Sequence, residues 1–260
     1  MKVFSHFFIL ALVLLPSLFF TNRAQAYANE NVTSSWQAEG YKPNYFLYGD
    51  PDSKLSLSFK IKILENSGFY LGYSQLMFWE LGADSSPFKD VNYNPEIFYR
   101  KYVEDRPSTW VDVGIFEHES NGQAGDLSRG WNRFYLLYSA EAFSWEQAKF
   151  YASLKAWVPY SKEDTNEDIV EYRGLWELNL TVSSFLGETF DRSDLTFRIY
   201  PGGRTGMDPT QGGQEITLRL KGVVFKEFLP VFTIQYFNGY GESLLSYNER
   251  ESTWRVGIGF

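Results

Sequence analysis

The residues best suited to chemistry in this chain gather around one histidine. The chain contains two histidines and no cysteine, and the first of them, His6, lies in an apolar N-terminal stretch. The other, His118, stands two residues before Ser120, and Asn132 opens a later apolar segment. Histidine gains and loses a proton near neutral pH, so it can act as a general base. Together these three residue types supply a base, a nucleophile and a group that orients the base.

The spacing of these residues has a structural meaning if they lie in β-strands. Residues i and i+2 of a strand point to the same face, which would place His118 beside Ser120. A hairpin would return Asn132 to His118, where its side-chain oxygen can accept the imidazole N–H. Gly122 permits a tight turn and leaves its backbone amide unhindered. The spacing alone is weakly specific, because the same residues also fit a strand end followed by an ordinary Ser-Asn-Gly turn.

An alternation of period two dominates the chain and predicts the strands that must position these residues. The alternation is clearest in 55–63, 149–158 and 217–221, and such strands face an apolar medium on one side and a polar one on the other. Further strands are expected near 44–48, 69–79, 95–103, 109–120, 131–139, 170–183, 194–200, 228–238 and 252–260. Turns are expected at 66–68, 105–108 and 187–188, and a long polar loop at 201–213. The total is about twelve strands, and bacterial membrane barrels have an even number.

The composition favours a membrane barrel over a soluble sheet protein. Aromatic residues make up 19% of the chain, yet the mean hydropathy is negative. Membrane barrels combine these properties because rings form belts at both interfaces while polar residues fill the lumen. The last strand alternates Trp254, Val256 and Ile258 and ends on Phe260. The sequence therefore predicts an all-β fold, a twelve-stranded antiparallel transmembrane β-barrel, with a soluble β-sandwich as the alternative.

The N-terminus indicates that the protein is exported, and the net charge disfavours one class of partner. Residues 1–26 have the features of a secretory signal peptide: a basic start at Lys2, an apolar run and the small-residue site Ala24-Gln25-Ala26. Residues 27–260 are then expected to form a single barrel domain with a short N-terminal segment. The net charge of −8 disfavours nucleic acid as a partner, because binding its phosphates needs a basic surface.

Several motifs resemble those of one known family. The segment His118-Glu119-Ser120-Asn121-Gly122, together with Trp131-Asn132-Arg133, closely resembles the active-site hairpin of the outer membrane phospholipase A family. Ser85–Phe88, Asn92–Pro95 and Tyr240–Leu244 are similar to the same family. The resemblance runs from about Tyr45 to the C-terminus and covers nearly all of the expected mature chain. It implies a calcium-dependent, homodimeric enzyme of the Gram-negative outer membrane that hydrolyses phospholipid acyl esters.

The resemblance also implies a role for each residue of the site. Ser120 would be the nucleophile, His118 the general base and acid, and Asn132 the residue that orients His118. The amide of Gly122 would stabilise the oxyanion. A calcium ion would be bound by the backbone oxygen of Gln123 and the hydroxyl of Ser128, and completed by Ser85 of the partner subunit.

Two polar residues on apolar faces need an explanation of their own. Gln75 shares a strand face with Leu71, Tyr73, Met77 and Trp79. In lipid its amide needs a partner, and two copies can satisfy each other across a dimer. A glutamine that faces the lumen after a register break fits the pattern equally well, and the family resemblance favours the dimer. Asp112 shares parity with His118, so it lies either on the lipid face near the membrane edge or beyond a β-bulge that shifts the register.

Two alternatives to the enzyme make distinct predictions. In a non-catalytic barrel, such as a channel or structural protein, His118, Ser120 and Asn132 need not converge. A soluble secreted hydrolase built on a β-sandwich would have no apolar belt on its outer surface.

Overall fold

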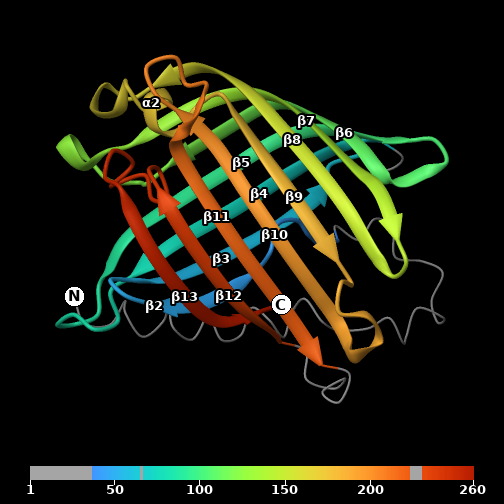
Figure 1. Cartoon of the computed structure of the whole chain (residues 1–260). Coiled ribbons are helices and arrows are strands. Elements are labelled where there is room, and N and C mark those ends of the chain that lie inside the picture. The colour runs from blue at the N-terminus through green and yellow to red at the C-terminus, as the bar shows by residue number, and fades with distance from the viewer. Residues whose placement is uncertain (1–36, 65–66, 223–229) are drawn as a thin grey trace, which may run out of the picture. The chain divides into compact units, whose positions relative to one another are not determined.

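A computed structural model describes residues 37–64, 67–222 and 230–260 of the chain. Within these ranges twelve strands, β2 to β13, pair antiparallel in chain order, and β13 pairs back onto β2. The sheet therefore closes on itself as a barrel (Figure 1). This confirms the predicted fold class and shows that the β-sandwich alternative is wrong. The expected signal peptide, residues 1–26, lies outside the described residues.

The strands are β1 (Ala38–Gly40), β2 (Tyr45–Gly49), β3 (Ser53–Lys62), β4 (Phe69–Trp79), β5 (Phe88–Val103), β6 (Arg106–Ser120), β7 (Gly130–Trp145), β8 (Ala148–Lys162), β9 (Trp176–Ser183), β10 (Phe190–Gly202), β11 (Asp208–Gly222), β12 (Val231–Gly239) and β13 (Glu251–Gly259). Most of them are long enough to cross a bilayer at a tilt, whereas β1, β2 and β9 are shorter. The short helices are η1 (Gly125–Leu127), η2 (Asp164–Asn166), α2 (Val170–Arg173) and η3 (Gly187–Thr189). In the part of the chain that is described, no helix is long and apolar enough to span a membrane.

Each of the twelve expected strands corresponds to one of β2–β13, and the structure corrects three local predictions. Residues 170–173, expected at the start of a strand, form the helical turn α2, because Ile169 packs into a buried cluster at this end of the barrel. The expected loop 201–213 is mostly strand, since β10 runs to Gly202 and β11 begins at Asp208. Gly213 is needed inside β11, because a Cβ there would lie 2.3 Å from the Tyr200 hydroxyl. The turn expected at 105–108 closes two residues earlier, between Val103 and Arg106.

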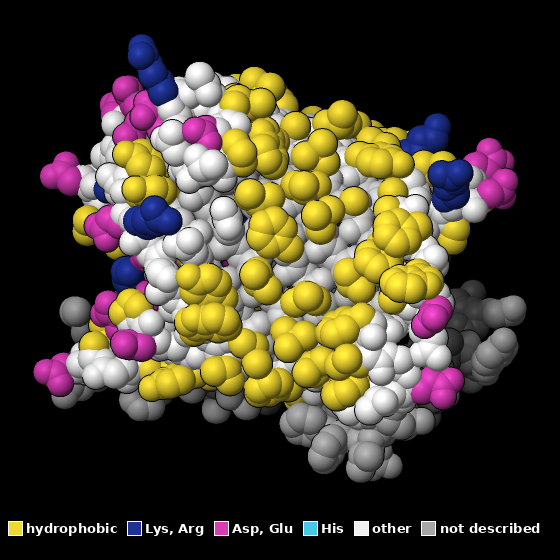
Figure 2. Space-filling model, viewed as in Figure 1, with side chains coloured by type: hydrophobic (Ala, Val, Ile, Leu, Met, Phe, Trp, Pro, Cys, Tyr) yellow, Lys and Arg dark blue, Asp and Glu magenta, His cyan; other side chains and the backbone are white. Residues whose placement is uncertain are grey.

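The outer wall is apolar and both of its ends are charged. Figure 2 shows hydrophobic side chains across the middle of the visible face, with the acidic and basic groups gathered toward its margins. Exposed apolar residues occur on many of the strands, among them Val113, Phe134, Leu136, Leu154, Val158, Ile216, Phe232, Trp254 and Val256. Apolar surface on this scale on the outside of a closed barrel is the signature of contact with lipid.

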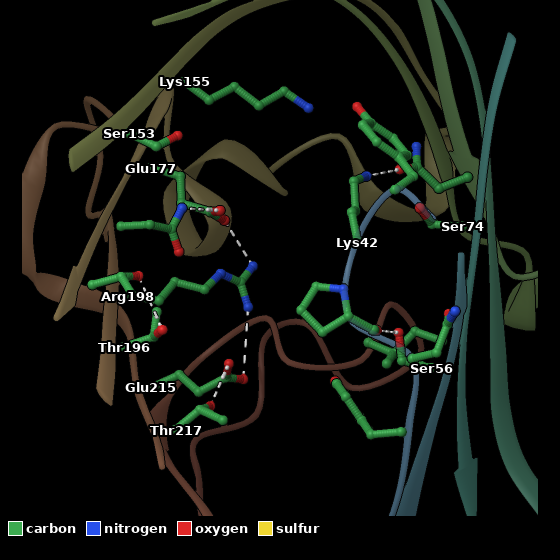
Figure 3. Close-up of a pocket in the computed structure, with 18 of the residues that line it drawn as sticks. Lys42, Ser56, Ser74, Ser153, Lys155, Glu177, Thr196, Arg198, Glu215 and Thr217 are labelled. Carbon is green, nitrogen blue, oxygen red and sulfur yellow. Dashed lines mark hydrogen bonds and ion pairs between the residues drawn. The ribbon is translucent and has the colours of Figure 1, made fainter. Parts of the chain in front are cut away.

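The lumen is polar and many of its charges are paired. It contains a cavity of about 490 Å³ whose walls carry Lys42 on one side and Glu177, Arg198 and Glu215 on the other (Figure 3). The Arg198 guanidinium lies 2.7 Å from a Glu177 carboxylate oxygen and 3.8 Å from one of Glu215. Paired charges tolerate this burial because each supplies the hydrogen bonds that water would otherwise make.

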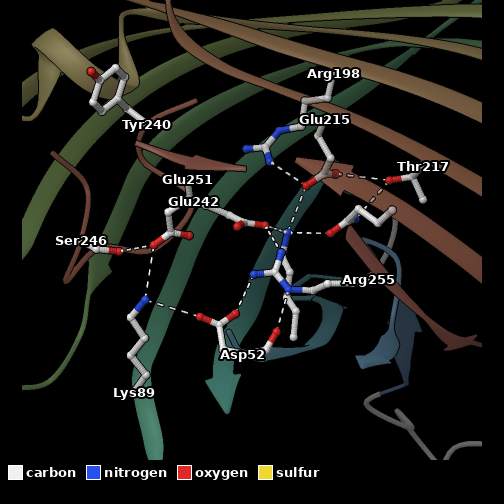
Figure 4. A network of polar contacts seen from close by, with 12 residues as sticks. Asp52, Lys89, Arg198, Glu215, Thr217, Tyr240, Glu242, Ser246, Glu251 and Arg255 are labelled. Carbon is white, nitrogen blue, oxygen red and sulfur yellow. Dashed lines mark hydrogen bonds and ion pairs between the residues drawn. The ribbon is translucent and has the colours of Figure 1, made fainter. Parts of the chain in front are cut away.

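A denser network of ion pairs lies inside the barrel toward the end that carries the β12–β13 loop (Figure 4). Arg255 binds Asp52 at 2.6 Å and Glu242 at 2.7 Å, and Lys54 binds Glu242 at 2.9 Å. Burial by itself would raise the pKa of Glu242, but the charges of Lys54 and Arg255 outweigh it and hold this pKa below its ordinary value. Antiparallel pairing places the β6–β7 and β8–β9 loops at the same end.

Candidate active site

The β6–β7 hairpin brings the three residues together on the outer wall. In its register His118 pairs with Asn132, and Ser120 pairs with Gly130. The His118 ring lies between its two partners: Nδ1 is 2.9 Å from Asn132 Oδ1, and Nε2 is 2.9 Å from Ser120 Oγ. Both distances are those of good hydrogen bonds. Phe116 stacks beside the imidazole, with ring centres 6.5 Å apart.

A β-bulge in β6 decides which way this group faces. Ile97 of β5 pairs with Phe116 and its neighbour Phe98 pairs with Gly114, so β6 has one extra residue, Ile115. Ile115 and Phe116 are both exposed on the outer wall. The extra residue reverses the parity of the strand, which lets Asp112 point inward while His118 points outward.

The bulge resolves the position of Asp112. Its side chain is fully buried in the lumen, and both of its oxygens accept hydrogen bonds of 2.7 Å from Arg100. Its parity with His118 in the sequence is therefore misleading, and no charge lies on the lipid face at this position.

The inner face of the same hairpin is held by charges. Glu117 and Glu119 point inward from β6, and Arg133 of β7 binds Glu117 at 3.0 Å and Glu119 at 2.8 Å. Lys155 binds Glu117 at 2.7 Å, and the Trp131 indole donates to Glu119 at 3.0 Å. The two strands that carry His118, Ser120 and Asn132 are thus cross-linked on their inner face, which fixes the relative positions of His118 and Asn132.

The loop between β6 and β7 is shaped by the buried side chain of Asn121. Its oxygen accepts hydrogen bonds from the amides of Gln123 at 3.3 Å and Arg129 at 2.9 Å. Its nitrogen donates to the Leu127 carbonyl at 2.9 Å. Gly122 has a φ of +66°, and a Cβ there would lie 3.0 Å from the Tyr93 ring. Glycine is therefore required both by the backbone conformation and by the space.

A second loop supports this one from the side. Asn166 of η2 is fully buried, and its carboxamide accepts from the Gly130 amide at 3.0 Å and donates to the Gly130 carbonyl at 3.2 Å. The Thr165 hydroxyl donates to the Ser128 carbonyl. The sequence does not predict the roles of Asn121 and Asn166 in holding this loop. Asn121 belongs to the motif around His118 without an assigned role. Asn166 lies 36 residues from Gly130, and no nearby sequence pattern marks it.

The remaining predicted residues lie in three places. Gln123 and Ser128 lie in the β6–β7 loop, whereas Ser85 lies in the β4–β5 loop with a φ of 65°. Gln75 pairs with Leu57 and Tyr93 on the neighbouring strands. Its side chain accepts a hydrogen bond of 2.9 Å from the Tyr73 hydroxyl. Tyr73 and Gln75 are two residues apart on β4 and therefore lie on the same face of the strand.

Comparisons with known proteins agree with this geometry. The model of the phospholipase A1 family matches residues 14–260. Phospholipase A1 of Salmonella typhimurium is 30% identical over 251 residues, covering 93% of this chain and 77% of that protein. Phospholipase A1 of Escherichia coli K12 is 31% identical over 200 residues, covering 75% of this chain and 62% of that protein.

Solved structures give the same result. A crystal structure of the Salmonella typhi outer membrane phospholipase dimer with bound calcium is similar, with a TM-score of 0.69 and 27% identity, over 86% of this chain and 92% of that one. Outer membrane phospholipase A from Escherichia coli has a TM-score of 0.68 and 26% identity, over 85% and 93% of the two chains. Because sequence and structure agree over nearly the whole length, the chain belongs to the phospholipase A1 family of outer membrane phospholipases.

Proposed function

We propose that this protein hydrolyses the acyl ester bonds of phospholipids in the Gram-negative outer membrane, with Ser120, His118 and Asn132 as its catalytic group. The observation that carries the assignment is the pair of 2.9 Å contacts that place the His118 ring between Ser120 and Asn132. A non-catalytic barrel has no need for this convergence on a wall that faces lipid.

The chemistry follows from the donors and acceptors. Nδ1–H of His118 donates to Asn132 Oδ1, which leaves Nε2 free to take the proton of Ser120 as its oxygen attacks the acyl carbonyl. The serine acyl ester forms, the bond to the glycerol oxygen breaks, and His118 returns the proton to that oxygen. Water then attacks the acyl ester with His118 again as base, which releases the fatty acid and restores Ser120.

The turn after the nucleophile provides for the oxyanion. Gly122 lies two residues beyond Ser120, its positive φ turns the chain there, and glycine has no side chain of its own beside the amide. An amide directed at the developing charge stabilises the transition state, and removal of one such donor typically costs about 3 kcal/mol.

The chemistry of the loop fits a calcium ion. Among the described residues no group of three or more His, Cys, Asp or Glu side chains is placed to hold a metal, and the loop offers carbonyl and hydroxyl oxygens instead. Gln123 is exposed in this loop, the loop also carries the Ser128 hydroxyl, and Asn121 holds both ends of it. Hard oxygen ligands of this kind suit calcium. When bound, calcium would supply positive charge that stabilises the oxyanion.

A homodimer would complete this arrangement. Ser85 lies on a loop of its own, so it is free to serve the site of another copy, and we assign Ser85 of the partner subunit as the remaining calcium ligand. Gln75, on an outer face shared with Leu71 and Tyr73, is assigned to the dimer interface. A buried amide in lipid gains most when a second polar group meets it.

The test measures fatty acid release from phospholipid in mixed detergent micelles, with calcium or with a chelator. Ser120→Ala and His118→Ala should each abolish calcium-dependent hydrolysis. Ser144→Ala should not, since Ser144 is an exposed serine at the opposite end of β7 whose hydroxyl donates to Glu141. Retention of full activity by Ser120→Ala would show that another residue is the nucleophile.

A further inference from the structure

A proline interrupts the strand that lies beside the catalytic hairpin. Pro95 stands in the middle of β5, where Tyr93 pairs with Ser120 and Glu96 pairs with Glu117. That register sets Pro95 opposite His118. Proline has no amide proton, so it cannot donate to a neighbouring strand and is rare inside sheets. The ladder between β5 and β6 therefore lacks a backbone donor next to the catalytic histidine.

The preceding residue supplies the donor instead. Asn94 points into the lumen, and its Nδ2 donates to the backbone carbonyl of His118 at 2.9 Å. A weaker contact of 3.4 Å joins the same nitrogen to Glu117. The side-chain carboxamide thus takes the place of the missing main-chain amide.

The carboxamide is itself held in position. Its oxygen accepts a hydrogen bond of 3.2 Å from the Lys42 ammonium, which also binds Glu96 at 3.0 Å. Lys42 belongs to the segment that precedes β2 and lies on the lumen wall (Figure 3). Because Lys42 can only donate, it fixes the oxygen of Asn94 toward itself and the nitrogen toward His118.

The position of this contact along β6 matters for catalysis. The bulge at Ile115 and Phe116 has already disrupted the ladder two residues before His118. Without a donor for the His118 carbonyl, the backbone that carries the catalytic ring would be poorly held between the bulge and Ser120. Displacements of about 1 Å can cost a hundredfold in rate.

We infer that Asn94 is a positioning residue of the hydrolase, whose carboxamide replaces the amide proton that Pro95 lacks and holds the backbone of His118 for catalysis. This role rests on the proposed function of His118 and Ser120. It makes Asn94 and Pro95 a functional pair: the asparagine is needed because the proline is present.

The pairing allows a rescue experiment. Asn94→Ala should lower kcat about tenfold with little change in KM, a loss that corresponds to about 1.4 kcal/mol. The double variant Asn94→Ala/Pro95→Ala should recover most of the lost rate, because alanine at position 95 restores a backbone donor opposite His118. Asn179→Ala is the matched control, since Asn179 is a lumen carboxamide that bonds to Glu177 on another wall. Its kcat should stay unchanged.

A second readout separates this inference from the proposed function. The rate at which a fluorophosphonate modifies Ser120 reports the reactivity of the serine without lipid turnover, and it should fall and recover in step with kcat. A wild-type protein that is inactive, or not modified at Ser120, would refute the proposed function itself. If the wild type is active and modified, then an unchanged kcat in Asn94→Ala overturns the role of Asn94. A folded double variant, shown by its heat-dependent shift on a gel, that stays as slow as Asn94→Ala overturns it as well.

Discussion

Replacing Asp112 with asparagine should destabilise the barrel by about 2–3 kcal/mol. Both oxygens of Asp112 bind Arg100 at 2.7 Å, and breaking a buried pair of this kind costs about 3–5 kcal/mol. The cost is lower here because asparagine keeps one acceptor. In addition, the Arg100 side chain is 10% exposed and its guanidinium lies 4.9 Å from the centre of the Trp110 ring. The free energy of unfolding can be measured by urea titration in lipid vesicles, followed by tryptophan fluorescence.

The sign of the effect tests the inward position of Asp112. If the carboxylate faced lipid, its removal would leave stability unchanged or increase it by up to about 2 kcal/mol, depending on its depth. Asp105→Asn is the matched control. Asp105 is exposed in the β5–β6 turn with a φ of 61°, which asparagine adopts readily, so its effect should stay within about 0.5 kcal/mol. An Asp112→Asn variant that is as stable as the wild type, with the control also neutral, would refute the inward placement.

Three further predictions concern the loops and the dimer. Asn121→Ala should weaken calcium binding about tenfold, measured by terbium luminescence and by the calcium dependence of hydrolysis; unchanged affinity would contradict the bracing role. The lowered pKa of Glu242 implies that its stabilising effect is complete above the ordinary glutamate value and is lost as the pH falls through the lower folded value. Glu242→Gln should therefore reduce the loss of unfolding free energy as the pH falls. If the variant loses stability at acid pH as steeply as the wild type, Glu242 does not contribute in this way. Gln75→Ala should weaken dimerisation about threefold to fifteenfold in sedimentation equilibrium, and no change would place the interface elsewhere.

Strand positions and the composition of the site could be predicted from the sequence because both depend on local patterns. Period-two alternation marks a strand wherever one face meets lipid and the other meets a polar lumen, and β4 spans the residues expected for it. The i, i+2 spacing of His118 and Ser120 needs only an extended backbone to place them on one face. The return of Asn132 needs only a hairpin, and its register pairs it with His118.

Other features depend on pairing between distant strands. Parity along β6 placed Asp112 on the same face as His118, and only the bulge, defined by the registers with β5 and β7, separates them. The apolar residues of the helical turn α2 fit a strand pattern, but in the structure they pack against a buried cluster at the end of the barrel and not against lipid. In both cases the alternation is present in the sequence, but contacts with distant parts of the chain decide which way the side chains face.

The sequence by itself determined that this chain forms a membrane barrel and that a histidine, a serine and an asparagine have the spacing of a base, a nucleophile and an orienting residue, because alternation and residue type are local properties. Only the tertiary structure decided that His118 faces outward and that Asn94 meets its backbone where Pro95 cannot. The physical reason is that a hydrogen-bond ladder is shared between strands. A bulge or a missing amide proton in one strand has consequences that can be located only once its partner and register are known.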